Sequence, residues 1–257
     1  MKALYTAATG MGAQQTRIDN IANNLANVNT TAYKKSRHAF EDLYYQELTR
    51  GGAAPGAMKA STPEVGGGVR ISAVQKDHRQ GVLQETGNPA HMALEGDGYF
   101  VLETPNGQPL YTRDGTFSVN ADGYLQTAGG YRLSGGVQIP EDADAFEIQA
   151  DGEVQVRLQG DDQTFSVGRI EIAGFANPAG LRSRGSNLME GSAEAGEARI
   201  LEVGTEVGLL QGYVEGSNVD VANELIEMIM AQRAYELTSK VVQTGDEMMQ
   251  VASNLKR

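Results

Sequence analysis

Residues 4–33 read LYTAATGMGAQQTRIDNIANNLANVNTTAY, and this stretch decides how the rest of the chain is organised. On a helix its apolar residues recur at alternating steps of four and three, the spacing of a coiled-coil seam. The seam positions are Leu4, Ala8, Met11, Gln15, Ile18, Ala22 and Leu25. Small or polar side chains fill several of these positions, and nearby glycines and asparagines lower the helix propensity. Such a helix is marginal by itself, so we predict that it needs a partner along its seam.

The predicted partner is a second helix at the other end of the chain. It begins after Asp220, a residue type favoured at helix N-termini, and Gly245 is the main interruption before residue 257. Its apolar residues mark one face at heptad-like steps: Val221, Leu225, Met228, Tyr235, Val242 and Met249, widened by Ile229, Val241, Met248 and Leu255. Ordinary packing of two helices in one domain is the alternative. The position of both helices at the chain ends favours a separate terminal helical domain.

The charge of the chain, −12 overall, is unevenly distributed. Residues 1–85 carry 10 basic and 7 acidic side chains, residues 86–216 carry 7 and 20, and residues 217–257 carry 4 and 6. Because contacts to phosphates need lysine and arginine, the acidic middle argues against a nucleic-acid partner. The ends, close to neutral, can pack against copies of themselves with little repulsion. The charge pattern therefore favours protein partners.

The sequence gives no indication of catalysis. The absence of cysteine excludes disulfides, thiolate metal sites and a cysteine nucleophile. The three histidines are far apart and form no metal-binding pair, so we predict no catalytic, metal or cofactor-binding residue. The first residues, MKALYTAATGMGAQQ, lack the apolar core of a secretory signal peptide, and no apolar run is long enough to insert in a membrane. Taken alone, this predicts a soluble cytoplasmic protein.

Two segments follow the first helix. A basic cluster of Lys34, Lys35, Arg37 and His38 is interpreted as a solvated helix end. Residues 49–68, TRGGAAPGAMKASTPEVGGG, are rich in glycine and alanine, and a structureless segment of this length is unusual inside a compact domain. We therefore predict an extended arm or flexible loop there.

From Val69 the apolar period changes to two. Ten short runs between residues 92 and 175 have the composition of strands, and Asp-Gly or Asn-Gly pairs separate many of them. Such pairs supply the positive φ angles that tight hairpin turns require. Asn106, Asp114 and Asp122 stand eight residues apart, as in successive antiparallel hairpins. The predicted fold is therefore α+β but mainly β, with a central antiparallel β-domain, a meander or partly closed barrel, between the terminal helices.

The asparagines at 20, 23, 24, 27 and 29 have two possible roles. In a monomer they cap the fraying end of a helix. In a polymer their amides can bond to neighbouring chains and fix register, as a polar seam residue does in coiled coils. A heterologous interface that repeats without closing generates a helical filament.

Three long segments resemble one known family. Residues 22–46, ANNLANVNTTAYKKSRHAFEDLYYQ, are similar to the N-terminal signature of bacterial flagellar axial proteins of the rod and hook. Residues 96–133, GDGYFVLETPNGQPLYTRDGTFSVNADGYLQTAGGYRL, resemble the β-domain of that family. Residues 212–250, GYVEGSNVDVANELIEMIMAQRAYELTSKVVQTGDEMMQ, resemble its C-terminal helix. Chain length and the SNVDVANELIEMI motif favour the distal rod over the proximal rod or the hook.

The resemblance implies a structural subunit that polymerises into the rigid helical drive shaft between motor and hook. It implies export by the flagellar type III apparatus without a cleaved signal peptide, and a rod that spans the periplasm, which replaces the cytoplasmic prediction. The implied partners are copies of the chain, proximal rod proteins, the hook protein, the P-ring and L-ring proteins, the rod cap and the export apparatus. Neither nucleic acid nor direct membrane insertion is implied.

By analogy, residues 1–34 with 217–257 form a coiled-coil assembly domain, 35–79 with 186–216 a connecting β-arm, and 80–185 an outer β-domain. The predicted assembly residues of the N-terminal segment are Leu4, Met11, Ile18, Asn23, Asn24, Leu25, Asn27, Asn29 and Tyr33. Those of the C-terminal helix are Val221, Leu225, Met228, Ile229, Tyr235, Val242 and Met249. Two alternatives stay open: a secreted β-domain that binds or acts on a ligand, and a monomeric scaffold whose terminal helices pack on each other.

Overall fold

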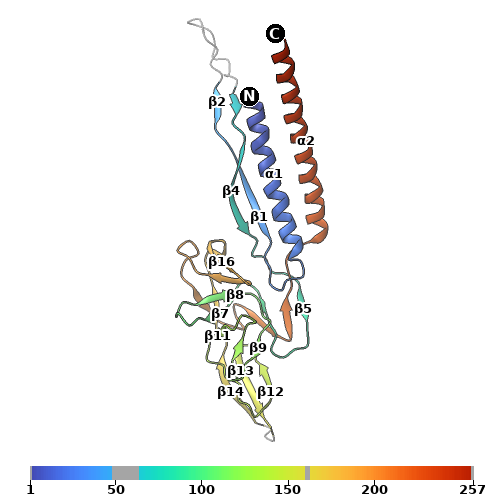
Figure 1. The fold of residues 1–257 in the computed structure, drawn as a ribbon. Coiled ribbons are helices and arrows are strands. Elements are labelled where there is room, and N and C mark those ends of the chain that lie inside the picture. Colours follow the sequence, from blue (N-terminus) through green and yellow to red (C-terminus); the bar gives the residue numbers. More distant parts are fainter. Residues whose placement is uncertain (1, 48–63, 160–162, 256–257) are drawn as a thin grey trace. The chain divides into compact units, whose positions relative to one another are not determined.

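A computed structural model describes residues 2–47, 64–159 and 163–255, which form two compact units (Figure 1). We call the residues up to 26, 36–75 and 220 onward the helical unit. Residues 27–35 and 76–219 form the β-rich unit. The helical unit therefore collects both ends of the chain, and each unit has its own internal contacts.

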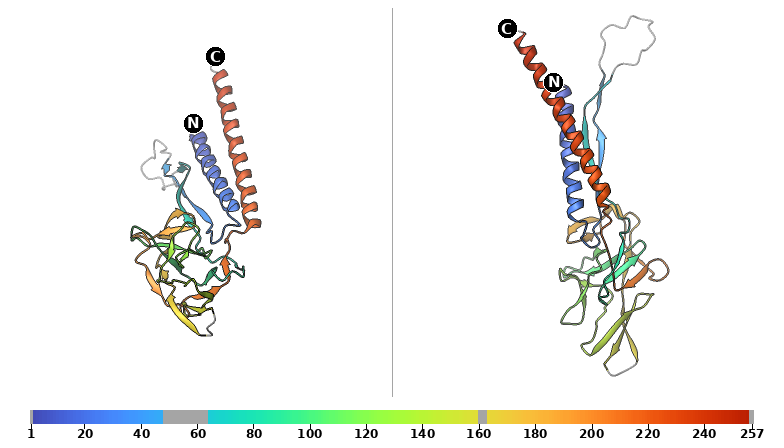
Figure 2. Two further views of the ribbon diagram at one scale, coloured as in Figure 1. Left: turned by 60° about the horizontal axis from the view of Figure 1, so that its bottom comes forward. Right: turned by 90° about the vertical axis from the view of Figure 1, so that its right-hand side faces the viewer.

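Two antiparallel helices dominate the helical unit. Helix α1 (Lys2–Ala26) and helix α2 (Val221–Asn254) lie side by side in the views of Figures 1 and 2. The predicted start of α2 is confirmed, because the Asp220 carboxylate accepts hydrogen bonds from the backbone N–H groups of Ala222 and Asn223. Helix α2 continues through Gly245 without a break. The Asp220 cap satisfies backbone donors that the helix itself leaves unpaired.

Short strand pairs complete the helical unit. Strand β1 (Ser36–Asp42) pairs with β4 (Val69–Lys76), and β2 (Tyr45–Glu47) pairs with β3 (Glu64–Gly66). Most of the predicted arm lies outside the described residues, which omit 48–63. We expected residues 35–79 and 186–216 to form one connecting β-arm, and this division stays a prediction. The described strands of 36–76 pair with one another, and closing a local hairpin costs less chain entropy than pairing distant segments.

The β-rich unit is built on a nine-stranded antiparallel sheet. Its order is β16–β17–β8–β7–β11–β10–β9, and β15 pairs with both β7 and β18. The strands are β7 (Tyr99–Glu103), β8 (Leu110–Thr112), β9 (Ser118–Val119), β10 (Leu125–Gln126), β11 (Arg132–Leu133), β15 (Ile172–Gly174), β16 (Arg182–Gly185), β17 (Leu188–Glu190) and β18 (Arg199–Leu201). The 3-10 turn Pro178–Gly180 lies between β15 and β16.

Three smaller sheets complete this unit. A three-stranded antiparallel sheet contains β12 (Ala143–Ile148), β13 (Glu153–Leu158) and β14 (Thr164–Arg169). Strand β6 (Met92–Glu95) pairs with β19 (Gly208–Gln211). Strand β5 (Leu83–Glu85) pairs with β20 (Tyr213–Glu215). The last two pairs bring residues far apart in sequence together, so the β-rich unit closes on itself before the chain enters α2.

The core explains why the first four residues of β7, Tyr99 to Leu102, are all apolar or aromatic. Phe100 and Leu102 belong to the main buried cluster, where the Phe100 ring meets Phe117 edge to face at 5.2 Å. Tyr99 and Val101, on the opposite side of the strand, belong to a second buried cluster. Because successive side chains of a strand point to opposite faces, a strand covered on both faces loses its polar alternation.

The strand predictions are confirmed, since each of the ten predicted runs contains a strand. The turn prediction is confirmed at Gly107, Gly123 and Gly152, which have positive φ angles. Gly115 is glycine for a different reason. A Cβ there would lie 1.5 Å from the Met92 carbonyl oxygen, so a close backbone approach excludes any side chain. The prediction of a mainly β chain with two terminal helices is correct.

Candidate assembly interface

Helices α1 and α2 contact each other, and small residues occupy part of their seam. Ala7 and Ile21 of α1 are buried, and Ala231 of α2 has no exposed surface. A Cβ added at Gly245 would lie 2.6 Å from Leu4 Cδ2, so the leucine packs directly on the α2 backbone. Small residues at a contact let two helix axes approach closely. The glycine that interrupts the apolar pattern of α2 is therefore a packing position.

At the other end of this seam lies a group of hydrogen bonds around Asn24, which we call the polar knot. The Asn24 amide nitrogen donates to the Ser36 carbonyl oxygen at 3.1 Å and to Glu224 Oε2 at 3.2 Å. Its amide oxygen accepts from the Ser36 N–H at 3.0 Å. Asn20 also donates to the Ser36 carbonyl, at 2.7 Å. One asparagine thus joins α1, α2 and the first residue of β1, whose backbone groups need partners when buried.

This knot corrects the prediction for Asn24 as a bond to a neighbouring chain. Asn24 is 2% exposed and its amide is bonded within its own chain. Asn23 and Asn29 are exposed. Asn27 and Tyr33 are half-buried residues of the β-rich unit. The structure therefore separates the asparagines into internal and exposed positions that the sequence pattern had treated alike.

The buried face of α1 also differs by one position from the predicted seam. Leu4, Met11, Ile18 and Leu25 are half-buried, as a seam position requires. The other predicted positions, Ala8, Gln15 and Ala22, are exposed. Adjacent residues of similar apolar character, such as Ala7 beside Ala8, give the two faces almost the same pattern. The sequence could not choose between them.

On α2, most of the predicted assembly residues are exposed in the single chain. Met228 and Val242 are half-buried, whereas Val221, Leu225, Ile229, Tyr235 and Met249 are exposed. The residues that contact or face α1 are smaller or polar, as at Ala231 and Gly245. Most of the apolar surface of this helix is therefore not used within the helical unit.

A second set of exposed apolar residues forms what we call the outer seam of α2. Its members are Met230, Leu237, Val241, Met248, Val251 and Leu255. Their exposed fractions lie between 53% and 82%. Residues 230, 237, 244 and 251 alternate with 234, 241, 248 and 255 at steps of four and three, a second heptad pattern. Sequence reasoning found only part of this pattern, because a more regular apolar face on the same helix masked it.

In the β-rich unit, three charged side chains are buried together, and we call Lys34, Arg113 and Glu215 the ion cluster. Glu215 Oε1 accepts from Lys34 Nζ at 2.5 Å and from the Gly81 N–H at 2.9 Å. Glu215 Oε2 accepts from Arg113 Nε at 2.8 Å. Burial lowers the pKa of Lys34, and Glu215 opposes that shift. One carboxylate thus serves two cations.

The ion cluster corrects the interpretation of the basic cluster that follows α1. Lys34 is 2% exposed and is not at a solvated helix end. Arg37 is exposed and lies on β1, while Lys35 and His38 are half-buried. The sequence around Lys34 gives no signal that this lysine is buried. Other basic residues follow it directly, and its partner Glu215 lies far along the chain.

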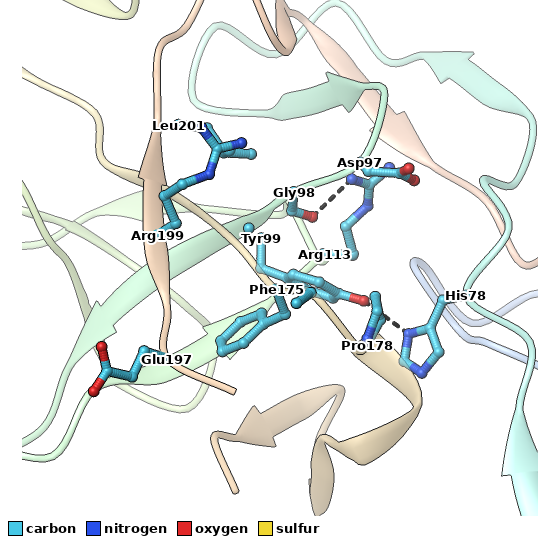
Figure 3. Close-up of a pocket in the computed structure, with 12 residues that line it drawn as sticks. His78, Asp97, Gly98, Tyr99, Arg113, Phe175, Pro178, Glu197, Arg199 and Leu201 are labelled. Atoms are coloured by element: carbon cyan, nitrogen blue, oxygen red, sulfur yellow. Dashed lines mark hydrogen bonds between the residues drawn. The ribbon is translucent and has the colours of Figure 1, made fainter. Parts of the chain in front are cut away.

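Arg113 of the ion cluster lines a cavity of about 410 Å³ in the β-rich unit (Figure 3). Tyr99 lies between Phe175 and His78, and its hydroxyl is 2.8 Å from His78 Nδ1. Burial, with Lys34 and Lys76 nearby, lowers the pKa of His78 to about 4. Burial also raises the pKa of the Tyr99 hydroxyl above its usual range. The Arg113 guanidinium donates to the Gly96 and Gly98 carbonyls at 2.7 Å. These polar groups bond to one another rather than pointing at a common reacting atom.

Two further properties concern the residues that the structure describes. No group of three or more His, Cys, Asp or Glu side chains in residues 2–47, 64–159 and 163–255 is arranged to hold a metal ion. Over the same residues, neither helix is long and apolar enough to cross a membrane.

Three family models match this chain. The flagella basal body rod protein model matches residues 4–34, and the flagellar hook protein FlgE/F/G D1 domain matches residues 93–156. The flagellar basal body rod FlgEFG protein C-terminal model matches residues 210–255. The matches thus fall on α1, on the middle of the β-rich unit and on α2, the three segments that carried the resemblance.

Full-length relatives are similar over both units. The flagellar basal-body rod protein FlgG of Agrobacterium fabrum is 44% identical, with 100% of both chains covered. FlgG of Borreliella burgdorferi is 43% identical over 100% of this chain and 99% of its own. The rod protein FlgF of Mesorhizobium japonicum is 32% identical over 93% of this chain and 91% of its own.

The chain belongs to the family of flagellar basal-body rod and hook proteins. It is a structural subunit of the flagellar rod, not an enzyme. Within the family its similarity to the FlgG rod proteins is higher than to the FlgF protein just described.

Proposed function

We propose that this chain polymerises helically through the outer seam of α2, and that the polymer is the distal rod, the rigid shaft that transmits torque from motor to hook. The observation that carries the proposal is the outer seam itself, six large apolar side chains at heptad spacing and 53–82% exposed. On soluble proteins, a large exposed apolar surface marks an interaction site. The heptad spacing supports coiled-coil-like packing against a neighbouring helix.

The energetics favour a contact with several neighbours at once. Full burial of a Leu, Met or Val side chain contributes about 1.5–3 kcal/mol, so completing the burial of six half-exposed ones contributes roughly 5–10 kcal/mol. Association itself costs about 4–15 kcal/mol. One such interface is therefore close to break-even, whereas a subunit held by several neighbours in a helical lattice is firmly bound.

The C-terminal end of α2 also supports assembly. Leu4 is the first residue of α1 whose side chain is described, and it packs on α2 at Gly245. Residues 246–254 extend α2 beyond this contact. An isolated helical turn is marginal in water, and binding to a neighbour stabilises it. Weak helices of this kind also unfold easily, which suits export through the narrow channel of the type III apparatus. We place the assembled chain in the periplasmic part of the basal body.

Three of the predicted interface residues of α2 support a further contact. Val221, Leu225 and Ile229, spaced four residues apart, form an exposed strip of the helix, which supports a second contact with another copy. For the β-rich unit, whose acidic side chains outnumber its basic ones, we propose contacts with the P-ring and L-ring proteins. The proximal rod proteins, hook protein and rod cap would contact the ends of the polymer. The monomeric-scaffold alternative leaves the outer seam unexplained.

The proposal is tested with a double variant, Leu237→Gln with Val241→Gln. Both side chains are exposed in the single chain, so the variant should fold and remain soluble. We expect loss of polymer in sedimentation at high protein concentration, and basal bodies without a complete rod in cells that carry only the variant. The matched control, Phe165→Gln with Ile200→Gln, changes two exposed apolar residues of the β-rich unit and should polymerise. Normal polymers from the first variant would overturn the proposed interface.

A further inference from the structure

The segments that join the β-rich unit to the helices are bonded to each other. We call residues 27–35, which follow α1, and 215–219, which precede α2, the paired connector. The Ala32 N–H donates to the Glu215 carbonyl at 2.7 Å, and the Asn218 N–H donates to the Tyr33 carbonyl at 3.3 Å. The Asn218 side-chain oxygen accepts from the Lys35 N–H at 2.8 Å. All of these residues belong to the β-rich unit.

The ion cluster lies at the base of this paired connector. Lys34 belongs to the segment that follows α1, and Glu215 belongs to the segment that precedes α2. Their side chains are each 1% exposed. Lys34 Nζ also donates to the Arg79 carbonyl at 2.8 Å, and Glu215 holds the Gly81 N–H. The lysine therefore fastens both segments to the loop that follows β4.

The charges show that this lysine is not needed to neutralise the cluster. Without Lys34, the Glu215 carboxylate would still be paired with Arg113 and bonded to Gly81. A buried ion pair is often no more stabilising than apolar side chains of similar size. The stability of the β-rich unit alone thus gives no reason for a second buried cation. A role in positioning does give a reason for a second buried cation. A directional bond from Lys34 can fix one connecting segment against the other, and buried polar groups are best known for setting register in this way.

We infer that Lys34 is a positioning residue that couples the two connecting segments, so that the segments entering and leaving the helices move as one body. The inference concerns the single chain and does not depend on the proposed polymer interface. It assigns to Lys34 a role that neither the sequence motif nor the burial of the residue alone indicates.

The test is hydrogen exchange of the monomeric full-length chain carrying Lys34→Met. We expect exchange to rise by about three- to fivefold in both connecting segments, 27–35 and 215–219, because the Lys34 bond that joins the two segments is lost. Exchange in the core strands β6 to β8 should stay unchanged. Lys34→Gln, which keeps a donor for Glu215, should restore much of the protection. Arg182→Met, which removes an exposed cation from the same unit, is the matched control.

Three results would overturn the inference. Faster exchange confined to residues 27–35 would show that the segments are not coupled. A uniform rise that includes β6 to β8 would show a general stability role. Unchanged exchange in both segments would show that backbone bonds such as that from Ala32 to Glu215 suffice to hold the paired connector.

Discussion

The ion cluster makes a sharp prediction for Glu215→Gln, because this one carboxylate serves two buried cations. A glutamine keeps one oxygen, which can take the place of Oε1 and accept from both Lys34 and Gly81. Its amide nitrogen would face Arg113 Nε, which is 2.8 Å from the present carboxylate oxygen and is itself a donor. The variant therefore leaves two buried cations without an anion.

The expected loss follows from these contacts. Breaking a buried pair by removing one partner costs about 3–5 kcal/mol, because it leaves an uncompensated buried charge. Lys34→Met removes a cation and leaves a neutral pair, so its cost should stay below about 1 kcal/mol. The free energy of unfolding of a domain is about 5–15 kcal/mol. Glu215→Gln should therefore remove a large share of it, and Lys34→Met only a small share.

The free energy of opening is best measured by hydrogen exchange in β6 to β8, which reports on the β-rich unit without the helices. Thermal unfolding of the full chain should show a midpoint lowered by about 10 °C for Glu215→Gln. Glu206→Gln is the control, since Glu206 forms an exposed ion pair with Arg199 and should have little effect. If Glu215→Gln and Lys34→Met cost the same, the charge argument is refuted.

Three further predictions concern other contacts. Asn24→Ala should destabilise the helical unit by about 1–3 kcal/mol, measured by urea unfolding, because the Ser36 N–H loses its Asn24 acceptor and Glu224 loses the Asn24 donor; a loss below 0.5 kcal/mol, roughly that of a surface change, would contradict the knot. Gly12→Ala should stabilise α1 by about 0.5–1 kcal/mol, since nothing lies within 4 Å of its new Cβ, whereas Gly245→Ala should gain nothing because Leu4 occupies that space. Equal stabilisation of both in thermal melts would rule out the packing described. The pKa of His78 is lowered to about 4, so its neutral ring stabilises the fold fully above pH 6.5, and this contribution is lost as the pH falls to 4. His78→Gln should therefore flatten the stability profile over that range by at most about 2 kcal/mol, and an unchanged slope would refute the assignment.

Local signals in the sequence predicted the strands and the start of α2. Apolar alternation and Asp-Gly turns located all ten runs, and Asp220 capped the helix as its side chain chemistry requires. Turns and helix caps depend only on residues close in sequence. A single residue such as Gly107 or Asp220 is therefore enough to predict one.

The faces of the helices could not be predicted in the same way. Helix α2 has apolar residues on more than one face, and nothing in the pattern says which face packs within the chain. The internal seam uses small and polar residues such as Ala231 and Asn24, which have weak apolar character. The burial of Lys34 was also beyond reach, because its partners Arg113 and Glu215 come from distant parts of the chain.

The central claim is that the outer seam of α2 is covered when subunits assemble, and the absence of native cysteine allows a direct measurement. A single cysteine at Leu237→Cys and, separately, at Ile200→Cys gives two thiols at positions 63% and 57% exposed in the single chain. Maleimide labelling of dilute monomer should be fast at both. In the polymer, we predict strong protection at position 237. Equal labelling rates for this thiol in monomer and polymer would contradict the claim.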